Sequence, residues 1–169
     1  MTAEEIEKYL SEIGDELAAQ NVVGEICIYG GAAMCLAFKA RPATRDVDAI
    51  FEPVKTVRGA IGRIAEKYGL NRDWLNLAVK MFVVEHEKRV LFDFPNLKVL
   101  VPTADYLLAM KVLAMRAESF DAADVEFLIG HLGLKKIEDV LKIVANYYPK
   151  KEVKRETEFQ LEEIFENLK

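Results

Sequence analysis

The residues best suited to chemistry are two aspartates, Asp46 and Asp48, which are separated by a single valine. On a β-strand, side chains two residues apart point to the same face and lie within roughly 7 Å of each other. Two carboxylates at that spacing can hold one or two Mg²⁺ ions, which bridge phosphate oxygens and stabilise an in-line phosphoryl displacement. The pair alone is a weak signal, because solvated strand edges and turns also carry aspartate.

A glycine pair upstream of the aspartates makes the signal more specific. Gly30 and Gly31 follow an apolar segment and precede a stretch of small residues. Main-chain N–H groups that no side chain shields can approach a phosphate closely, although a tight turn uses glycine equally well. Thr44 and Arg45 directly precede the aspartates, and Arg45 can neutralise a triphosphate. A strand, a glycine turn, a helix and a second strand with paired aspartates together predict a nucleotide site.

A second set of charged residues lies in the C-terminal half. Lys111 falls within an apolar helical stripe by its i, i+3 and i+4 spacing. A buried, unpaired ammonium is costly, so Lys111 must extend to solvent or meet an anion. Asp121 and Asp124 open the next predicted helix. Asp121 has the position of an N-cap, and Asp124 is the better candidate for pairing with Lys111.

These motifs resemble the nucleotidyltransferase superfamily. The stretch from Gly30 to Asp48 resembles its G-G/S…D-x-D signature. The stretches 106–116, which ends at Arg116, and 121–128 resemble the helical lysine and the K/R-D-x-x-D-h-x-x-L motif of the AbiEii-like branch, which includes bacterial toxin nucleotidyltransferases. The matched pieces run from about residue 25 to about residue 132, which is most of the chain.

The resemblance implies a metal-dependent transfer of a nucleoside monophosphate from an NTP to an RNA, protein or small-molecule acceptor, with release of pyrophosphate. By matching position, Asp46 and Asp48 would hold Mg²⁺, and Gly30 and Gly31 would contact the phosphates. Lys111 would engage the nucleotide phosphates. A toxin-type enzyme would also have a cognate antitoxin as its partner.

The third carboxylate that most active members of the superfamily use is not placed by the sequence. Asp93 is the first candidate, although it alternates with the apolar residues of its strand, and Glu85 is the second. Asp121 or Asp124 would complete the site by matching position. If no third carboxylate reaches the pair, the alternative is a non-catalytic nucleotide- or partner-binding module of the same fold.

Composition limits the other possibilities. The formal net charge of −5 argues against nucleic-acid binding over the whole surface, so an RNA acceptor would need a local basic patch. Two cysteines in apolar segments predict reduced, buried thiols and a cytoplasmic location. No apolar run approaches the ~20 residues that span a bilayer. The strongest basic patch consists of Lys150, Lys151, Lys154 and Arg155.

The elements that must position these residues divide the chain into two halves. Strands crowd the first half and helices the second, which predicts an α+β fold with a mixed sheet, flanking helices and a helical C-terminal half. We expect one domain over residues 1–169, with a sheet-containing core at 1–102 and a helical part at 103–169. Helices are predicted over residues 3–20, 32–38, 54–69, 103–118, 121–132, 136–147 and 153–167. Strands are predicted over residues 22–29, 46–51, 79–85, 89–94 and 97–101, the third and fourth pairing as a hairpin that turns at residues 86–88.

Overall fold

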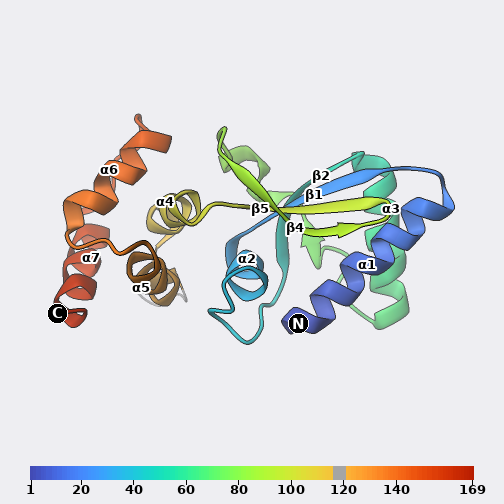
Figure 1. Cartoon of the computed structure of the whole chain (residues 1–169), viewed down its shortest axis with the longest axis horizontal. Coiled ribbons are helices and arrows are strands. Elements are labelled where there is room, and N and C mark those ends of the chain that lie inside the picture. Colours follow the sequence, from blue (N-terminus) through green and yellow to red (C-terminus); the bar gives the residue numbers. More distant parts are fainter. Residues whose placement is uncertain (116–120) are drawn as a thin grey trace. The chain divides into compact units, whose positions relative to one another are not determined.

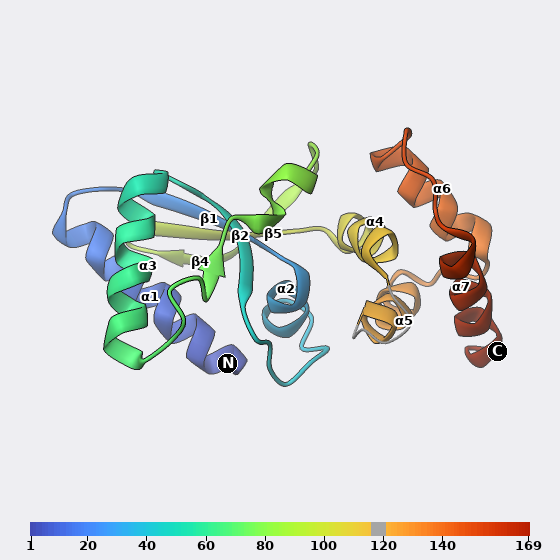
Figure 2. The same ribbon diagram turned by 180° about the vertical axis from the view of Figure 1, so that it is seen from behind.

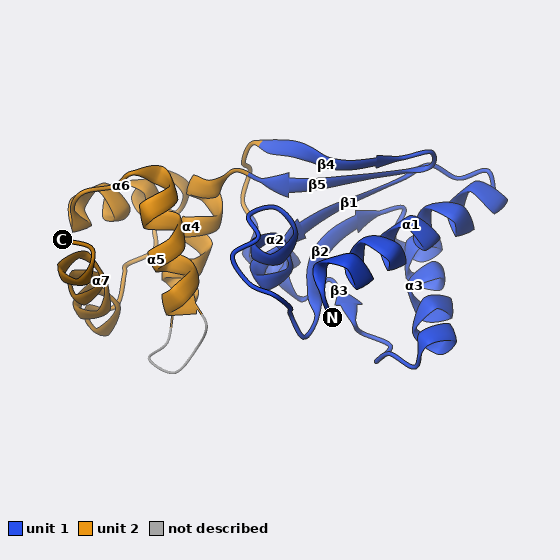
Figure 3. Cartoon of the chain, turned by 60° about the horizontal axis from the view of Figure 1, so that its bottom comes forward, with its two compact units in different colours: residues 1–83, 88–102 blue, residues 84–87, 103–169 orange. Residues whose placement is uncertain are grey.

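The computed structural model describes residues 1–115 and 121–169 and divides into two compact units (Figure 3). The first, called here the sheet unit, comprises Met1–Val83 and Lys88–Pro102. The second, called here the helical unit, comprises Val84–Glu87 and Thr103–Lys169. The predicted α+β class with a helical C-terminal half is confirmed (Figure 1). The interpretation of the whole chain as one domain stays a prediction.

The described elements follow the predicted order closely. In the sheet unit they are α1 Ala3–Ala19, β1 Gly24–Tyr29, α2 Gly30–Leu36, β2 Val47–Glu52, α3 Val54–Tyr68, β3 Leu75–Asn76, the 3-10 helix η1 Ala78–Phe82, β4 Lys88–Phe94 and β5 Leu97–Pro102. In the helical unit they are α4 Ala104–Ala114, α5 Asp121–Leu132, α6 Ile137–Tyr147 and α7 Arg155–Asn167.

The sheet is mixed, with the strand order β3-β2-β1-β5-β4. The β1–β2 and β4–β5 pairs are antiparallel, and the β1–β5 and β2–β3 pairs are parallel. Its central strands β1 and β5 are both largely buried, as their apolar sequences predict.

Helices α1 and α3 pack on one face of this sheet and against each other (Figures 1 and 2). The apolar residues of α1 recur every three or four positions and are fully buried, so its amphipathic pattern is the cause of its packing. At Gly24 on β1, an added Cβ would lie 2.7 Å from Leu17 of α1 and 3.5 Å from Val57 of α3. Both helices therefore approach the same face of β1.

Strand β2 places its alternate side chains on opposite faces. Val47, Ala49 and Phe51 are buried, whereas Asp48 and Ile50 are half-buried. Because Ala49 pairs with Ile28 and Phe51 with Ile26, the buried set faces α1 and α3 together with Gly24. Asp48 therefore lies on the face of the sheet opposite these helices.

The predicted hairpin of residues 79–85 and 89–94 is wrong. Residues 78–82 form η1, and β4 pairs instead with β5 through the turn at residues 95–96. The Asn76 side chain accepts a hydrogen bond from the Ala78 N–H at 3.0 Å, which starts a turn where the apolar pattern indicated a strand. Met81 and Phe82 are 83% and 62% exposed, so these apolar side chains do not belong to the core.

The helical unit is built around α4, which contacts both α5 and α6, while α6 contacts α7. The residue range 84–87 joins this unit because the Val84 N–H donates to Tyr106 Oη at 3.1 Å and the His86 ring stacks on the Tyr106 ring at 4.0 Å. Within the described residues, no helix combines the length and the apolar character that crossing a lipid bilayer demands.

Both cysteines are buried and neither forms a disulfide, as the sequence predicts. Burial raises the pKa of the Cys27 and Cys35 thiols above the usual value. Both thiols are therefore held in the neutral form, which suits a packing role.

Candidate functional site

The glycine turn connects β1 directly to α2. The helix begins at Gly30, two residues earlier than predicted, and ends at Leu36, two residues earlier than predicted. Gly30 has a φ of +60°, a left-handed conformation that glycine adopts without steric cost. The chain can therefore pass from β1 to α2 without an intervening loop.

The Asp48 carboxylate lies against this turn. Tyr29 at the end of β1 pairs with Asp48 on β2, and a Cβ added to Gly30 would lie 3.1 Å from Asp48 Oδ2. Because Gly30 has no side chain, the Asp48 carboxylate can lie close to its main chain. The structure brings together two elements that the sequence identified separately, the glycine pair and the second aspartate.

Two further groups surround Gly31. A Cβ at this position would lie 2.7 Å from Arg41 Nη1 and 2.9 Å from Thr44 Oγ1, both shorter than side chains tolerate. Thr44 directly precedes the aspartates and is part of the predicted nucleotide site, whereas the sequence assigns no role to Arg41. No local pattern distinguishes Arg41 from a solvated loop arginine.

Asp46 and Arg45 lie on the loop just before β2. The strand begins at Val47, so Asp46 precedes it by one residue instead of opening it, and both Asp46 and Arg45 are exposed. The Thr44 hydroxyl donates to the Asp46 carbonyl at 3.3 Å, and the Thr44 N–H donates to the Met1 carbonyl at 2.9 Å. The loop is thereby fixed on one side to the N-terminal segment.

The structure does not bring Asp93 to the aspartate pair. Asp93 is exposed on β4, which is three strands away from β2, or about 14 Å across the sheet. The register pairs Asp93 with Lys98, and Lys98 with Glu25, which lies four residues from the end of β1 that pairs with Asp48. Asp93 is therefore also displaced by about 13 Å along the strands, which is too far to share a metal ion with Asp48.

The residue that pairs with Asp48 on its other side is Asn76 of β3. Directly paired residues point to the same face, so Asn76 shares the face of Asp48. Its Oδ1 accepts from the Ala78 N–H at 3.0 Å and its Nδ2 donates to the Asp73 carbonyl at 3.2 Å. The strand neighbour of Asp48 thus offers an amide in place of a third carboxylate. The two-residue strand β3 was not predicted from the sequence.

Asp46 and Asp48 fit a Mg²⁺ ion by their chemistry. Mg²⁺ prefers oxygen ligands and is usually held by one or two carboxylates, with water and substrate phosphates completing its shell. Among the described residues there is no group of three or more histidine, cysteine, aspartate or glutamate side chains that could enclose a metal. An ion held by the two aspartates would take its remaining ligands from other oxygen groups, such as substrate phosphates or water.

Lys111 lies in the helical unit and is only 7% exposed. Its Nζ donates to Asp121 Oδ1 at 2.8 Å and lies 2.8 Å from Asp124 Oδ2. The predicted pairing with Asp124 is present, and Asp121, which the sequence favoured as an N-cap, also binds the lysine. Glu85 is exposed in the segment 84–87 of the same unit. Arg116 lies outside the described residues.

The helical unit contains a second polar cluster, which was not predicted from the sequence. Tyr147 Oη donates to Asp105 Oδ2 at 2.6 Å, and Thr103 Oγ1 donates to Asp105 Oδ1. Although burial opposes ionisation, these hydrogen bonds outweigh it and lower the pKa of Asp105. Burial and the bond to Asp105 raise the pKa of Tyr147 to about 12. The contact joins the start of α4 to the end of α6, 42 residues later.

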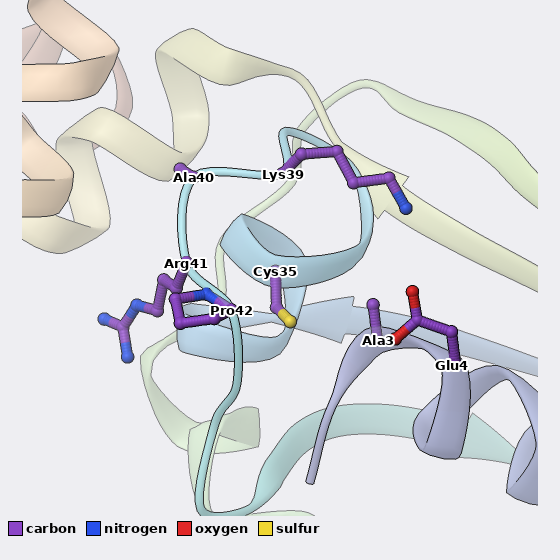
Figure 4. A pocket seen from close by; sticks show the side chains of 7 residues that line it. All are labelled: Ala3, Glu4, Cys35, Lys39, Ala40, Arg41 and Pro42. Carbon is purple, nitrogen blue, oxygen red and sulfur yellow. The ribbon is translucent and has the colours of Figure 1, made fainter.

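A shallow hollow of about 480 Å³ lies beside the loop that follows α2 (Figure 4). Cys35, Lys39 and Arg41 line it, but Figure 4 shows the Arg41 side chain extending away from the Cys35 side of the hollow. The Arg41 guanidinium lies against Gly31, where its Nη1 is 2.7 Å from the position of an added Cβ.

A family model described as "Nucleotidyltransferase of unknown function (DUF6036)" matches residues 4–169 of the chain. The chain belongs to this family. The nucleotidyltransferase assignment implied by the Gly-Gly and D-x-D motifs is thus confirmed at the level of the family. A comparison with curated proteins gives no match.

Proposed function

We propose that this nucleotidyltransferase moves a nucleoside monophosphate from an NTP to an acceptor in a Mg²⁺-dependent reaction. The observation that carries the proposal is the position of the Asp48 carboxylate, which packs directly against the glycine turn beside Thr44 and Arg41. A carboxylate, a hydroxyl and a guanidinium around a bare stretch of main chain form a surface suited to a metal-bound polyphosphate.

In this reaction an acceptor hydroxyl forms a bond to the α-phosphorus, the bond to the bridging oxygen of pyrophosphate breaks, and the hydroxyl proton is released. Mg²⁺ held by Asp46 and Asp48 would offset the charge on the reacting phosphate oxygens. Gly30 and Gly31 leave room for the phosphate chain to approach the main chain. Catalysis would depend mainly on positioning and charge stabilisation.

The proposed acceptor is an RNA or a protein, as in the toxin-type AbiEii-like branch, and the proposed partner is a cognate antitoxin. The exposed cluster of Lys150, Lys151, Lys154 and Arg155 supports a polyanionic acceptor, because it concentrates positive charge on a chain that is acidic as a whole. Lys111 would engage the nucleotide phosphates only by exchanging its contacts with Asp121 and Asp124.

A second candidate is a nucleotide-binding module without turnover. Asn76 favours it, since an amide occupies the position on the strand next to Asp48 from which a third carboxylate would reach the metal. This module would bind NTP with Mg²⁺ and release no pyrophosphate.

Incubation of the full chain with labelled NTPs, Mg²⁺ and total cellular RNA and protein separates the two candidates. Label on an acceptor together with pyrophosphate release identifies an enzyme and the class of its acceptor. Tight NTP binding with neither product identifies a module.

Asp46→Asn and Asp48→Asn test the metal site itself. Both substitutions remove a charged oxygen ligand, so we expect Mg²⁺-dependent NTP binding to fall sharply in each. The matched control is Asp15→Asn, which removes the same charge from an exposed position on α1. Unaltered Mg²⁺ and NTP binding in both site variants would refute the proposed metal centre.

A further inference from the structure

The loop between α2 and β2 presents an arginine to the glycine turn that the sequence did not single out. Arg41 Nη1 lies 2.7 Å and its Cζ 3.1 Å from the position of a Cβ on Gly31. The guanidinium therefore rests on the main chain of Gly31, and the absence of a side chain there is what admits it.

The groups around the turn are chemically complementary to one ligand. Asp48 Oδ2 lies 3.1 Å from the Cβ position of Gly30, on the residue next to Gly31. Because consecutive Cα atoms are about 3.8 Å apart, the carboxylate and the guanidinium border the same short stretch of main chain. A metal-bound phosphate at Asp48 would place its neighbouring phosphates beside Arg41.

The loop holds Arg41 in place on both sides. Before it, the Ala40 N–H donates to the Met34 carbonyl at 3.0 Å, and Lys39 adopts a positive φ of 54°. After it, Pro42 restricts the backbone of Arg41, and Ala43 pairs with Thr2 in a β-bridge. A loop whose backbone is fixed in this way loses little backbone entropy when its side chain binds a ligand.

Arg45, the arginine expected from the sequence to neutralise the triphosphate, lies differently. It is exposed, whereas Arg41 is half-buried against the turn. Guanidinium groups bind phosphate oxygens through two parallel hydrogen bonds, and partial burial strengthens such bonds. Burial and proximity to Gly31 therefore favour Arg41 over Arg45.

We infer that Arg41 is the residue that binds the β- and γ-phosphates of the NTP, next to a metal-bound phosphate at Asp48. This inference rests on the proposed function, since it requires a nucleoside triphosphate at the glycine turn. It assigns to Arg41 the recognition of a triphosphate over a monophosphate, because only the former extends beyond the metal-bound phosphate.

The test compares nucleotides of different length on variants of the full chain. Binding of the four NTPs, of the matching NMPs and of inorganic triphosphate is measured with Mg²⁺ by titration calorimetry. Arg41→Ala should weaken NTP and triphosphate binding about 10- to 100-fold, the range for one charge-assisted contact, and NMP binding only slightly. Arg41→Lys should recover part of the loss, since it restores the charge without the paired hydrogen bonds.

Arg58→Ala, at an exposed position on α3, is the matched control and should leave all affinities unchanged. Arg45→Ala should cost less than Arg41→Ala. Equal NTP affinity in wild type and in a folded Arg41→Ala or Arg41→Gln variant would overturn the inference alone, as would an equal loss for NTP and NMP. Absence of NTP binding by the wild type would instead overturn the proposed function.

Discussion

The charged cluster of the sheet unit and that of the helical unit differ in how far their side chains are buried. In the sheet unit, Asp46 is exposed and Asp48 is half-buried on the face of the sheet that α1 and α3 leave open. In the helical unit, the Lys111 and Asp124 side chains are 9% and 4% exposed, and they bind each other within the fold. The cluster in the sheet unit is accessible to solvent, whereas the charges in the helical unit form an ion pair that is largely buried within the fold.

The difference in burial predicts different effects of substitution on stability and on ligand binding. A buried ion pair contributes little net stability, but removal of one partner leaves a buried charge behind. An exposed carboxylate can be neutralised with little effect on folding. Substitutions should therefore act on stability in the helical unit and on binding in the sheet unit.

The largest effect is expected from Lys111→Met. The substitution removes the cation shared by Asp121 and Asp124, so the free energy of unfolding should fall by about 3–5 kcal/mol. Urea unfolding followed by circular dichroism measures the change. Lys142→Met, at an exposed position on α6, is the control and should change stability little.

The double variant Lys111→Met, Asp124→Leu sharpens the comparison. It replaces the buried charges by apolar groups and should recover much of the lost stability. Recovered stability with retained NTP binding would assign Lys111 to the fold alone. Recovered stability with lost NTP binding would give Lys111 a second role at the nucleotide.

The next effect concerns Tyr147 and alkaline pH. Its folded pKa of about 12 lies above the usual value of 10.0, so its stabilisation is complete below pH 10 and is lost between about pH 10 and pH 12. Tyr147→Phe removes the hydrogen bond to Asp105 and should cost about 1.5 kcal/mol at neutral pH.

Unfolding titrations of both proteins from pH 8 to pH 12 measure this effect. The variant should lose less stability than the wild type over the alkaline range. Burial also raises the pKa of Tyr148, so a smaller alkaline loss should persist in the variant. Identical pH profiles would show that the Tyr147–Asp105 contact does not contribute to stability.

The sequence predicted the elements better than their assembly. Periodicity located α1, α3, α5 and α6 to within a few residues, because each buries a continuous apolar face. The existence of β3 depends on its pairing with β2, which lies far from it in the sequence and which no local pattern indicates. The predicted hairpin failed because residues 78–82 form η1, and β4 pairs with β5 across the turn at residues 95–96.

The same limit applies to the site. Gly30, Asp48 and Thr44 were predicted because they lie in one short motif, and the structure brings them together. Arg41 and Asn76 reach the same place only through tertiary structure, one on a loop and one on a neighbouring strand. Asp93 was a candidate by residue type, and strand order excludes it.

A smaller effect is expected from Gly30→Ala. Its left-handed backbone costs alanine about 1 kcal/mol, and the added methyl group would lie 3.1 Å from Asp48 Oδ2. Stability should fall slightly, whereas NTP binding with Mg²⁺ should fall much more, because the carboxylate is displaced. Gly62→Ala on α3, where an added Cβ meets nothing within 4 Å, is the control. A loss of stability without a change in NTP affinity would contradict the proposal that the glycine turn contacts the nucleotide.

The smallest effect on stability, and the sharpest test of the sheet unit, is Asn76→Asp. It adds a carboxylate beside Asp48 on the same face of the sheet, and additional charged oxygen ligands tighten metal binding. Aspartate can still accept from the Ala78 N–H but loses the bond to the Asp73 carbonyl, so stability should change by less than about 1 kcal/mol.

Calorimetric titration with Mg²⁺ should then give a several-fold lower Kd for Asn76→Asp than for the wild type. Asn71→Asp makes the same change at an exposed position of the preceding loop and should leave the Kd unaltered. A gain of pyrophosphate release together with tighter Mg²⁺ binding would mean that Asn76 is what keeps the wild type from turnover. An unchanged Kd would place the metal away from the β2–β3 pair, and the solvent-accessible aspartates of the sheet unit would then no longer be assigned to metal binding.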